Sequence, residues 1–179
     1  MKWQDISRSI APKLGGNSAL ADERPIMVVQ SKSQQLLVID CEEGEIARYK
    51  ISTADNGIGN RQDSFKTPFG IHRIRQKIGG GERLGSVFKA REPTGQLMRT
   101  RNNTETDEIT SRILWLDGLE DGVNKGGDVD TYSRYIYIHG TSDEKRLGQP
   151  VSKGCIRMKN EDVIELFDNV LLNDLVIID

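Results

Sequence analysis

The stretch that decides the fold runs from residue 139 to residue 157 and reads HGTSDEKRLGQPVSKGCIR. The apolar run 135–138 before it predicts a β-strand that delivers His139 at its end, where a side chain reaches solvent while its backbone stays fixed. Cys155 follows Gly154, and a glycine at that place permits the tight turn that a nucleophile needs. A thiol becomes a strong nucleophile beside an imidazole base. The stretch therefore predicts a catalytic pair of Cys155 with His139.

The neighbours of this cysteine supply polar groups suited to chemistry on a carbonyl carbon. A tight turn at Gly154 can direct successive backbone N–H groups toward one point, as an oxyanion hole requires. Lys153 adds positive charge that favours a thiolate. Arg157 could bind a substrate carboxylate through two parallel hydrogen bonds. The alternatives are a structural cysteine in a turn, with Arg157 in a surface ion pair, and a surface histidine at a strand end.

The remaining histidine and cysteine have different surroundings. His72 lies inside a predicted strand, so a packed histidine is favoured over a catalytic one. Cys41 precedes Glu42, and nearby negative charge disfavours a thiolate, which indicates a structural thiol. One bridge between the two cysteines remains open, but one reactive and one structural thiol are favoured. A metal site at His139 and Cys155 is disfavoured because structural zinc takes four ligands, so no metal or cofactor is expected.

Outward from this stretch, short alternating or apolar runs separated by turn residues predict a mainly β fold. The predicted strands are Ile26–Gln30, Gln35–Asp40, Glu45–Ser52, Phe69–Ile74, Ile113–Leu116, Tyr135–Ile138 and Leu175–Ile178. Apolar spacing over Glu161–Val170 predicts one amphipathic helix, with Asn160 as its N-cap. Residues 91–108 and 117–130 are polar and predict long surface loops.

Composition bounds the class of protein. The chain has 179 residues, of which 36% are hydrophobic and 29% charged, and this predicts one folded domain. A net charge of −2 gives no basic face, so nucleic acid is not an expected partner. No stretch is apolar and long enough to span a membrane, and the first 25 residues contain no secretory apolar run. The expected location is the cytoplasm, or the periplasm if a leader had been removed.

The quoted stretch resembles the signature of the L,D-transpeptidase catalytic domain, also called YkuD-like. The resemblance rests on 138-IHGT-141 and on 148-GQPVSKGCIRM-158, which contains the family's H-G…S-x-G-C-x-R core. The segment 66-KTPFG-70 is similar to the family's T-P-x-G element. The likeness covers about residues 25–179 and leaves 1–24 as an N-terminal extension. It implies a β-sandwich-like fold with one or more short helices.

The resemblance also implies an activity and partners. Cys155 would attack a peptidoglycan stem peptide, form a thioester and release terminal D-alanine, with peptidoglycan or soluble muropeptides as substrates and carbapenems as inhibitors. His139 would be the base, oriented by the backbone carbonyl of Gly140. The N–H groups of Gly154 and Cys155 would form the oxyanion hole. The residues expected to bind substrate are Ser152, Lys153 and Arg157.

Two features leave the exact reaction open. Lys153 stands where the family commonly has histidine, which bears on the acceptor or substrate preference. The N-terminus without a leader is similar to that of relatives that resemble cytoplasmic L,D-carboxypeptidases, which trim recycled tetrapeptides with water as the acceptor. The alternatives to transpeptidation are therefore such a carboxypeptidase and a peptidoglycan-binding module without catalytic activity.

Overall fold

The structure, a computed structural model, describes residues 4, 6, 12, 24–98 and 107–179. Within these residues the fold consists of ten strands, one α-helix and short 3-10 turns. The strands are β1 (Ile26–Gln30), β2 (Gln35–Asp40), β3 (Gly44–Ser52), β4 (Gly70–Ile78), β5 (Ser86–Lys89), β6 (Glu92–Leu97), β7 (Ile109–Gly118), β8 (Tyr137–Thr141), β9 (Ile156–Met158) and β10 (Leu175–Ile178). The helix is α2 (Asn160–Asn169), and the 3-10 turns are η2 (Gly127–Val129) and η3 (Glu144–Arg146).

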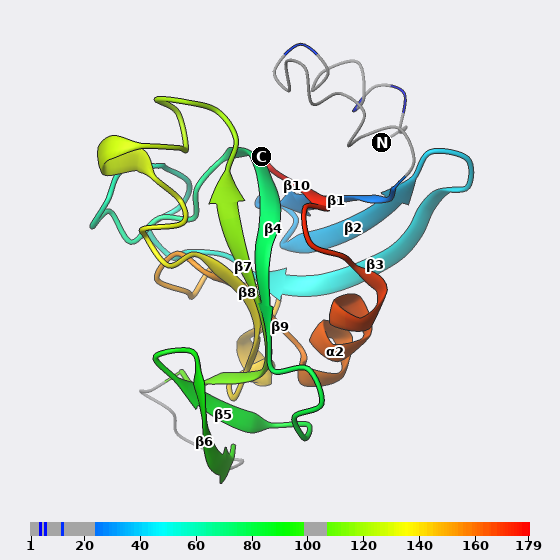
Figure 1. Ribbon diagram of the computed structural model, residues 1–179, viewed down its shortest axis with the longest axis vertical. Coiled ribbons are helices and arrows are strands. Elements are labelled where there is room, and N and C mark those ends of the chain that lie inside the picture. The colour runs from blue at the N-terminus through cyan, green and yellow to red at the C-terminus, as the bar shows by residue number, and fades with distance from the viewer. Residues whose placement is uncertain (1–3, 5, 7–11, 13–23, 99–106) are drawn as a thin grey trace.

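The strands form a single sheet that closes on itself. Its order is β4-β10-β1-β2-β3-β9-β8-β7-β5-β6, and β4 also pairs with β7. This second pairing joins the two ends of an eight-strand ring and leaves the β5–β6 hairpin attached to β7. Figure 1 shows β1, β2 and β3 crossing β4 and β7 at a steep angle. Most edges are therefore paired, which protects the sheet from adding foreign strands.

Successive side chains of β1 and β2 point to opposite faces of the sheet and therefore pack into two separate cores. Met27 and Val29 of β1 face the larger core, while Ile26 and Val28 face a second cluster. Both faces of β1 are buried, which explains why its sequence is uniformly apolar rather than alternating with polar residues. The larger core lies between β1–β3 and the strands β4 and β7–β9, which pack face to face. The mainly β, sandwich-like fold predicted from the sequence is confirmed.

The helix closes one end of the larger core. Val163, Leu166 and Phe167 of α2 are buried among the strand residues. Full burial of such side chains stabilises the fold by about 1.5–3 kcal/mol each. The helix follows β9 after a single residue, Lys159.

Three local expectations need correction. Residues 92–97, expected in a surface loop, form strand β6, because they pair with β5 although all six are exposed. Strand β7 extends to Gly118, past the expected end at Leu116. The helix N-cap is Lys159 rather than Asn160, whose side chain instead enters the interior and bonds Thr110 and Ser111. Residues 99–106 and most of the expected N-terminal extension lie outside the described residues.

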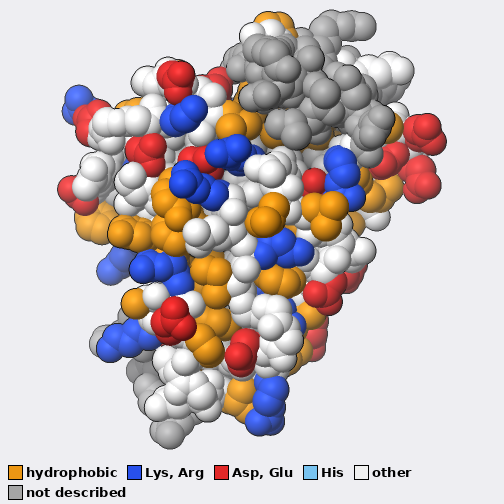
Figure 2. Space-filling model, viewed as in Figure 1, with side chains coloured by type: hydrophobic (Ala, Val, Ile, Leu, Met, Phe, Trp, Pro, Cys, Tyr) orange, Lys and Arg blue, Asp and Glu red, His pale blue; other side chains and the backbone are white. Residues whose placement is uncertain are grey.

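Charges are mixed on the surface. Basic and acidic side chains are interspersed on the face shown in Figure 2, apart from the grey residues. Among the helices of the described residues, none combines the length and the hydropathy of a membrane span.

Candidate active site

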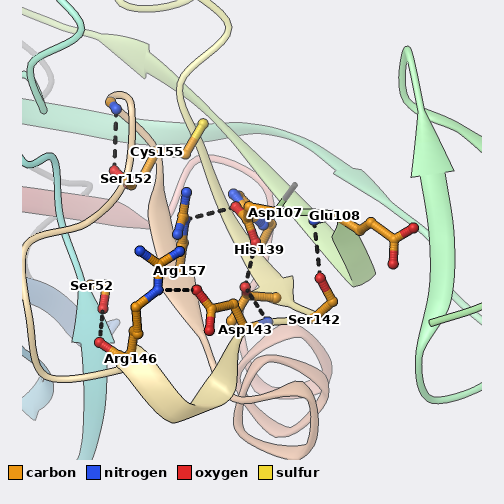
Figure 3. Close-up of polar contacts among 12 residues, drawn as sticks. Ser52, Asp107, Glu108, His139, Ser142, Asp143, Arg146, Ser152, Cys155 and Arg157 are labelled. Carbon is orange, nitrogen blue, oxygen red and sulfur yellow. Dashed lines mark hydrogen bonds and ion pairs between the residues drawn. The ribbon is translucent and has the colours of Figure 1, made fainter. Parts of the chain in front are cut away.

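Two neighbouring parallel strands carry the predicted catalytic residues. His139 lies buried in the middle of β8, not at the solvent-reaching strand end that the sequence predicted, and Cys155 immediately precedes β9. The strands run parallel in a register that places His139 opposite Arg157 and Ile138 opposite Ile156. The parallel pairing thus places residues that are separated in sequence side by side in the sheet. Figure 3 shows the side chains of His139, Cys155 and Arg157 around a common space.

That space is a cavity of about 550 Å³. It is lined by Asp107, Ile109, His139, Arg146, Val151, Ser152, Lys153, Cys155 and Arg157. The structure therefore brings together five of the seven residues that the sequence predicted for the site. The other two, Gly140 and Gly154, adjoin lining residues in the chain.

His139 is buried and held in one orientation. Only 2% of its surface is exposed, and its Nδ1 lies 2.7 Å from the carbonyl oxygen of Gly140. A carbonyl oxygen only accepts, so Nδ1 carries the proton and Nε2 is the basic atom. Within the described residues, Nε2 makes no hydrogen bond. Burial lowers the pKa of His139, against the opposite effect of the Asp107 carboxylate, so the imidazole is neutral near pH 7.

Gly140 is a glycine because its surroundings leave no space for a side chain. A Cβ there would lie 2.6 Å from the backbone oxygen of Thr110 and 2.7 Å from Oδ1 of Asn160. Asn160 is fixed in turn, since it accepts bonds from the hydroxyls of Thr110 and Ser111 and donates to the carbonyl of Thr141. This buried polar cluster therefore sets the position of the carbonyl that orients His139.

Cys155 is a half-buried free thiol. Its Sγ accepts the N–H of Tyr137 at 3.4 Å and donates to the carbonyl of Tyr135 at 3.5 Å. Burial raises the pKa of the thiol to about 11, and the nearby Asp107 carboxylate acts in the same direction. The thiol is therefore protonated near pH 7 in this arrangement, and a thiolate would form only as a base removes the proton.

The turn before the cysteine is held by two hydroxyl groups. Gly154 has a φ of 129°, a conformation that favours glycine. The hydroxyl of Ser152 donates to the carbonyl of Cys155 at 2.5 Å and accepts the N–H of Gly154 at 3.2 Å. The hydroxyl of Thr67 donates to the carbonyl of Gly154 at 2.9 Å and accepts the N–H of Ala54 at 2.9 Å. In this state the Gly154 N–H predicted for the oxyanion hole is bonded to Ser152.

Arg157 enters the cavity from β9 and meets a carboxylate that the sequence did not indicate. Its Nε lies 2.7 Å from Oδ2 of Asp107, and both side chains are largely buried. Arg146 also lines the cavity and pairs with Asp143. Lys153 is exposed, and among the described residues it forms no ion pair. Three cations therefore face the cavity, as Figure 3 shows for the two arginines.

Sequence reasoning missed three residues at or near the site, namely Asp107, Thr67 and Arg134. Asp107 reaches the site because β7 pairs with β8 in a register that sets Ile109 opposite Thr141, a contact with no local signal. Thr67 belongs to the T-P-x-G element, so the resemblance could have indicated it. Arg134 donates to the carbonyl of Lys66 at 2.6 Å, and its positive charge lowers the pKa of Cys155.

The other candidates lie elsewhere. His72 is fully buried, with its ring nitrogens 3.1 Å from the carbonyl oxygen of Gly70 and 3.1 Å from the hydroxyl of Thr131. Cys41 follows β2 as a second free thiol. In the described ranges, no three His, Cys, Asp or Glu side chains gather in a way that could hold a metal ion.

Comparisons with known proteins connect the chain to one family. The family model for "L,D-transpeptidase catalytic domain" (YkuD) matches residues 24–178. A Bacillus subtilis protein named "Putative L,D-transpeptidase YqjB" is 44% identical over 92 residues, which are 51% of this chain and 47% of that protein. The Bacillus subtilis protein named "Putative L,D-transpeptidase YkuD" is 48% identical over 48 residues, 24% of this chain and 29% of that protein. The chain thus spans about half or less of these curated relatives.

Solved structures share the fold. L,D-transpeptidase 3 from Mycobacterium tuberculosis, in complex with a faropenem-derived adduct, superposes with a TM-score of 0.53 at 15% identity, over 87% of this chain and 60% of that one. The L,D-transpeptidase LdtMt1 in complex with imipenem superposes with a TM-score of 0.53 at 16% identity, over 88% of this chain and 59% of that one. Because the family model covers nearly the whole chain, this protein belongs to the L,D-transpeptidase catalytic domain family.

Proposed function

We propose that the protein catalyses cysteine-dependent acyl transfer on peptidoglycan stem peptides. The donor is a tetrapeptide, cleaved between the L-centre of its diamino acid and its terminal D-alanine. The observation that supports the proposal most is the cavity shared by Cys155 and His139, in which Nε2 of the imidazole makes no hydrogen bond within the described residues. The imipenem complex of one structural neighbour and the faropenem-derived adduct of the other support a reactive nucleophile in this fold.

In the first step, His139 removes the thiol proton as Sγ attacks the donor carbonyl carbon. A base is required because the pKa of Cys155 is raised to about 11. The negative charge that develops on the carbonyl oxygen would be stabilised by the N–H of Cys155, and by that of Gly154 once its bond to Ser152 opens. The carbon–nitrogen bond then breaks, D-alanine leaves with the proton from His139, and a thioester remains.

In the second step, an acceptor attacks the thioester carbonyl. His139 takes a proton from the acceptor and returns it to the thiolate as the carbon–sulfur bond breaks. An amine of a second stem peptide gives a cross-link, whereas water gives a shortened tripeptide. Both reactions use the same residues up to the thioester, so the carboxypeptidase remains the alternative.

The choice of acceptor is tested directly with a disaccharide tetrapeptide. Incubation followed by mass spectrometry distinguishes a tripeptide, formed with loss of D-alanine and gain of water, from dimers or products that carry an exchanged D-amino acid. Dimers or exchange are expected for the transferase. A tripeptide alone would assign the protein to the carboxypeptidases.

A peptidoglycan-binding module without activity is the second alternative, and thiol labelling separates it. Carbapenem treatment is expected to add one acyl group to the protein and to protect Cys155 from a maleimide, while Cys41 remains reactive. An unprotected Cys155 that also leaves the tetrapeptide unchanged would favour the binding module.

A further inference from the structure

Asp107 lies outside the signature stretch yet lines the cavity. It precedes β7 and lines the same space as Cys155, His139 and Arg157. Its side chain is only 16% exposed. Figure 3 shows its carboxylate beside His139, with a contact to Arg157. No step of the proposed reaction uses this group.

The two oxygens of Asp107 connect the two catalytic strands. Oδ2 lies 2.7 Å from Nε of Arg157, on β9 just after Cys155. Oδ1 accepts the hydroxyl proton of Thr141, on β8 just after His139. Since little water reaches the pair, the attraction between the carboxylate and the guanidinium is stronger than on an open surface. The carboxylate is thus placed to fix the guanidinium relative to the histidine.

The guanidinium keeps unused binding capacity in this arrangement. Nε and Nη1 of Arg157 are both buried, and within the described residues neither makes a hydrogen bond, so Asp107 meets Nε as an ion pair alone. A buried donor without an acceptor is unfavourable, and native proteins seldom leave one without a reason. A carboxylate is the acceptor that best matches a guanidinium, because two parallel bonds can form.

We propose that Asp107 is a positioning residue: its ion pair holds the guanidinium of Arg157 in place so that the N–H groups without a hydrogen bond receive a carboxylate of the donor peptide, next to the bond that breaks. The role of this carboxylate rests on the proposed function. The positioning of Arg157 and the electrostatic effect of Asp107 on His139 do not depend on turnover.

Asp107 also balances the charge of Arg157 at the catalytic pair. The described charged groups that act on His139 and Cys155 are Asp107 before β7, Arg157 on β9 and, for the thiol, Arg134 before β8. Asp107 raises the pKa of both His139 and Cys155, whereas Arg157 lowers both. Removing the carboxylate charge leaves Arg157 unopposed, so the pKa of both groups should fall.

Two measurements without turnover test the proposal. The first is the pKa of His139 by NMR titration in the Asp107→Asn, Asp107→Glu and Asp121→Asn variants. Asp107→Asn should lower this pKa, Asp107→Glu should largely preserve it, and Asp121→Asn, which removes an exposed carboxylate elsewhere, should not change it. A pKa of His139 that is unchanged in Asp107→Asn would overturn the positioning role even if the enzyme is active.

The second is calorimetric binding of a tetrapeptide to protein carrying Cys155→Ser, which binds without reacting. Adding Asp107→Asn should weaken binding about tenfold, adding Arg157→Ala should weaken it at least as much, and combining both should give no further loss. Fully additive losses, or no loss with Asp107→Asn, would overturn the link to Arg157. If Cys155→Ser binds no tetrapeptide, the carboxylate role is overturned together with the proposed substrate, while the titration still decides the positioning role.

Discussion

The two histidines of this chain occupy similar settings with different chemical outcomes. His72 on β4 and His139 on β8 are both buried, and the Nδ1 of each lies within hydrogen-bond distance of a glycine carbonyl. Burial lowers the pKa of both, and that of His72 falls to about 4. The difference lies at Nε2, which meets the hydroxyl of Thr131 in His72 and makes no hydrogen bond within the described residues in His139, a residue that lines the cavity together with Cys155.

This comparison shows that burial, strand position and a lowered pKa do not identify a catalytic base. An imidazole whose two nitrogens both have internal partners is a structural crosslink. The other imidazole has one nitrogen fixed and one unbonded within the described residues, next to a thiol that needs a base. The unbonded nitrogen and the cavity therefore carry the functional argument, and substitutions at matched positions can test it.

The largest effect is expected at the thiols. Cys155→Ser should reduce release of D-alanine by more than about ten-thousandfold, because a hydroxyl is a far weaker nucleophile beside a neutral imidazole. Cys41→Ser should retain activity within about twofold. Both are measured as kcat/KM with the disaccharide tetrapeptide. Appreciable turnover by Cys155→Ser would contradict covalent catalysis by this residue.

Substitution of the two histidines should change kcat/KM by amounts that differ almost as much. His139→Gln should lower kcat/KM by about 10²–10⁴-fold, the usual contribution of a general base. His72→Gln should stay within about threefold, because its ring does not line the cavity. Thermal unfolding of both variants provides the control for folding. Equal losses of activity would remove the distinction between the two imidazoles.

Substitution of the glycine that bonds each histidine should have a different kind of effect, on activity for Gly140 and on stability for Gly70. Gly140→Ala places a Cβ against Thr110 and Asn160, and should lower kcat/KM by about ten- to a hundredfold as the carbonyl moves. Gly70→Ala meets Glu120 and Asn124 at a φ of 104°, and should destabilise the fold by about 1–3 kcal/mol with little change in kcat/KM. A Gly140→Ala variant with full activity would show that this carbonyl does not position the base.

The last comparison concerns the dependence of stability on pH, where no change in activity is expected. The pKa of His72 falls from 6.5 in the unfolded chain to about 4 in the fold, so the unfolded state binds a proton first as the pH drops. Its contribution to stability is full above pH 6.5 and is lost toward pH 4, by roughly 3 kcal/mol. His139 acts in the same direction and is still present in His72→Gln. The free energy of unfolding should therefore fall more steeply with decreasing pH in the wild type, which has both histidines, than in the variant. Urea unfolding at pH 7, 5.5 and 4.5 measures both slopes, and equal slopes would contradict the pKa assigned to His72.

The sequence predicted much of the fold because the relevant signals are local. Strands β1, β2 and β10 have the predicted bounds, since turn residues limit each apolar run. The hairpin strands β5 and β6 were missed because β6 is exposed throughout and carries a proline and a glycine, which are depleted in strands. Its pairing with β5, rather than its own composition, makes it a strand.

The sequence by itself determined the chemical candidates, a thiol after a glycine and an imidazole before one. It also predicted that His72 packs rather than reacts, and the structure places that ring in the interior. Such conclusions need only neighbouring residues, because backbone geometry and side-chain type are local properties.

Only the tertiary structure decided which groups surround that pair. The parallel register of β8 and β9 sets Arg157 opposite His139, and the pairing of β7 with β8 brings in Asp107. Contacts of this kind depend on how distant strands align, and a register slip of one residue would turn every side chain to the other face. Charges, burial and pKa values in the cavity follow from that alignment and not from the order of residues along the chain.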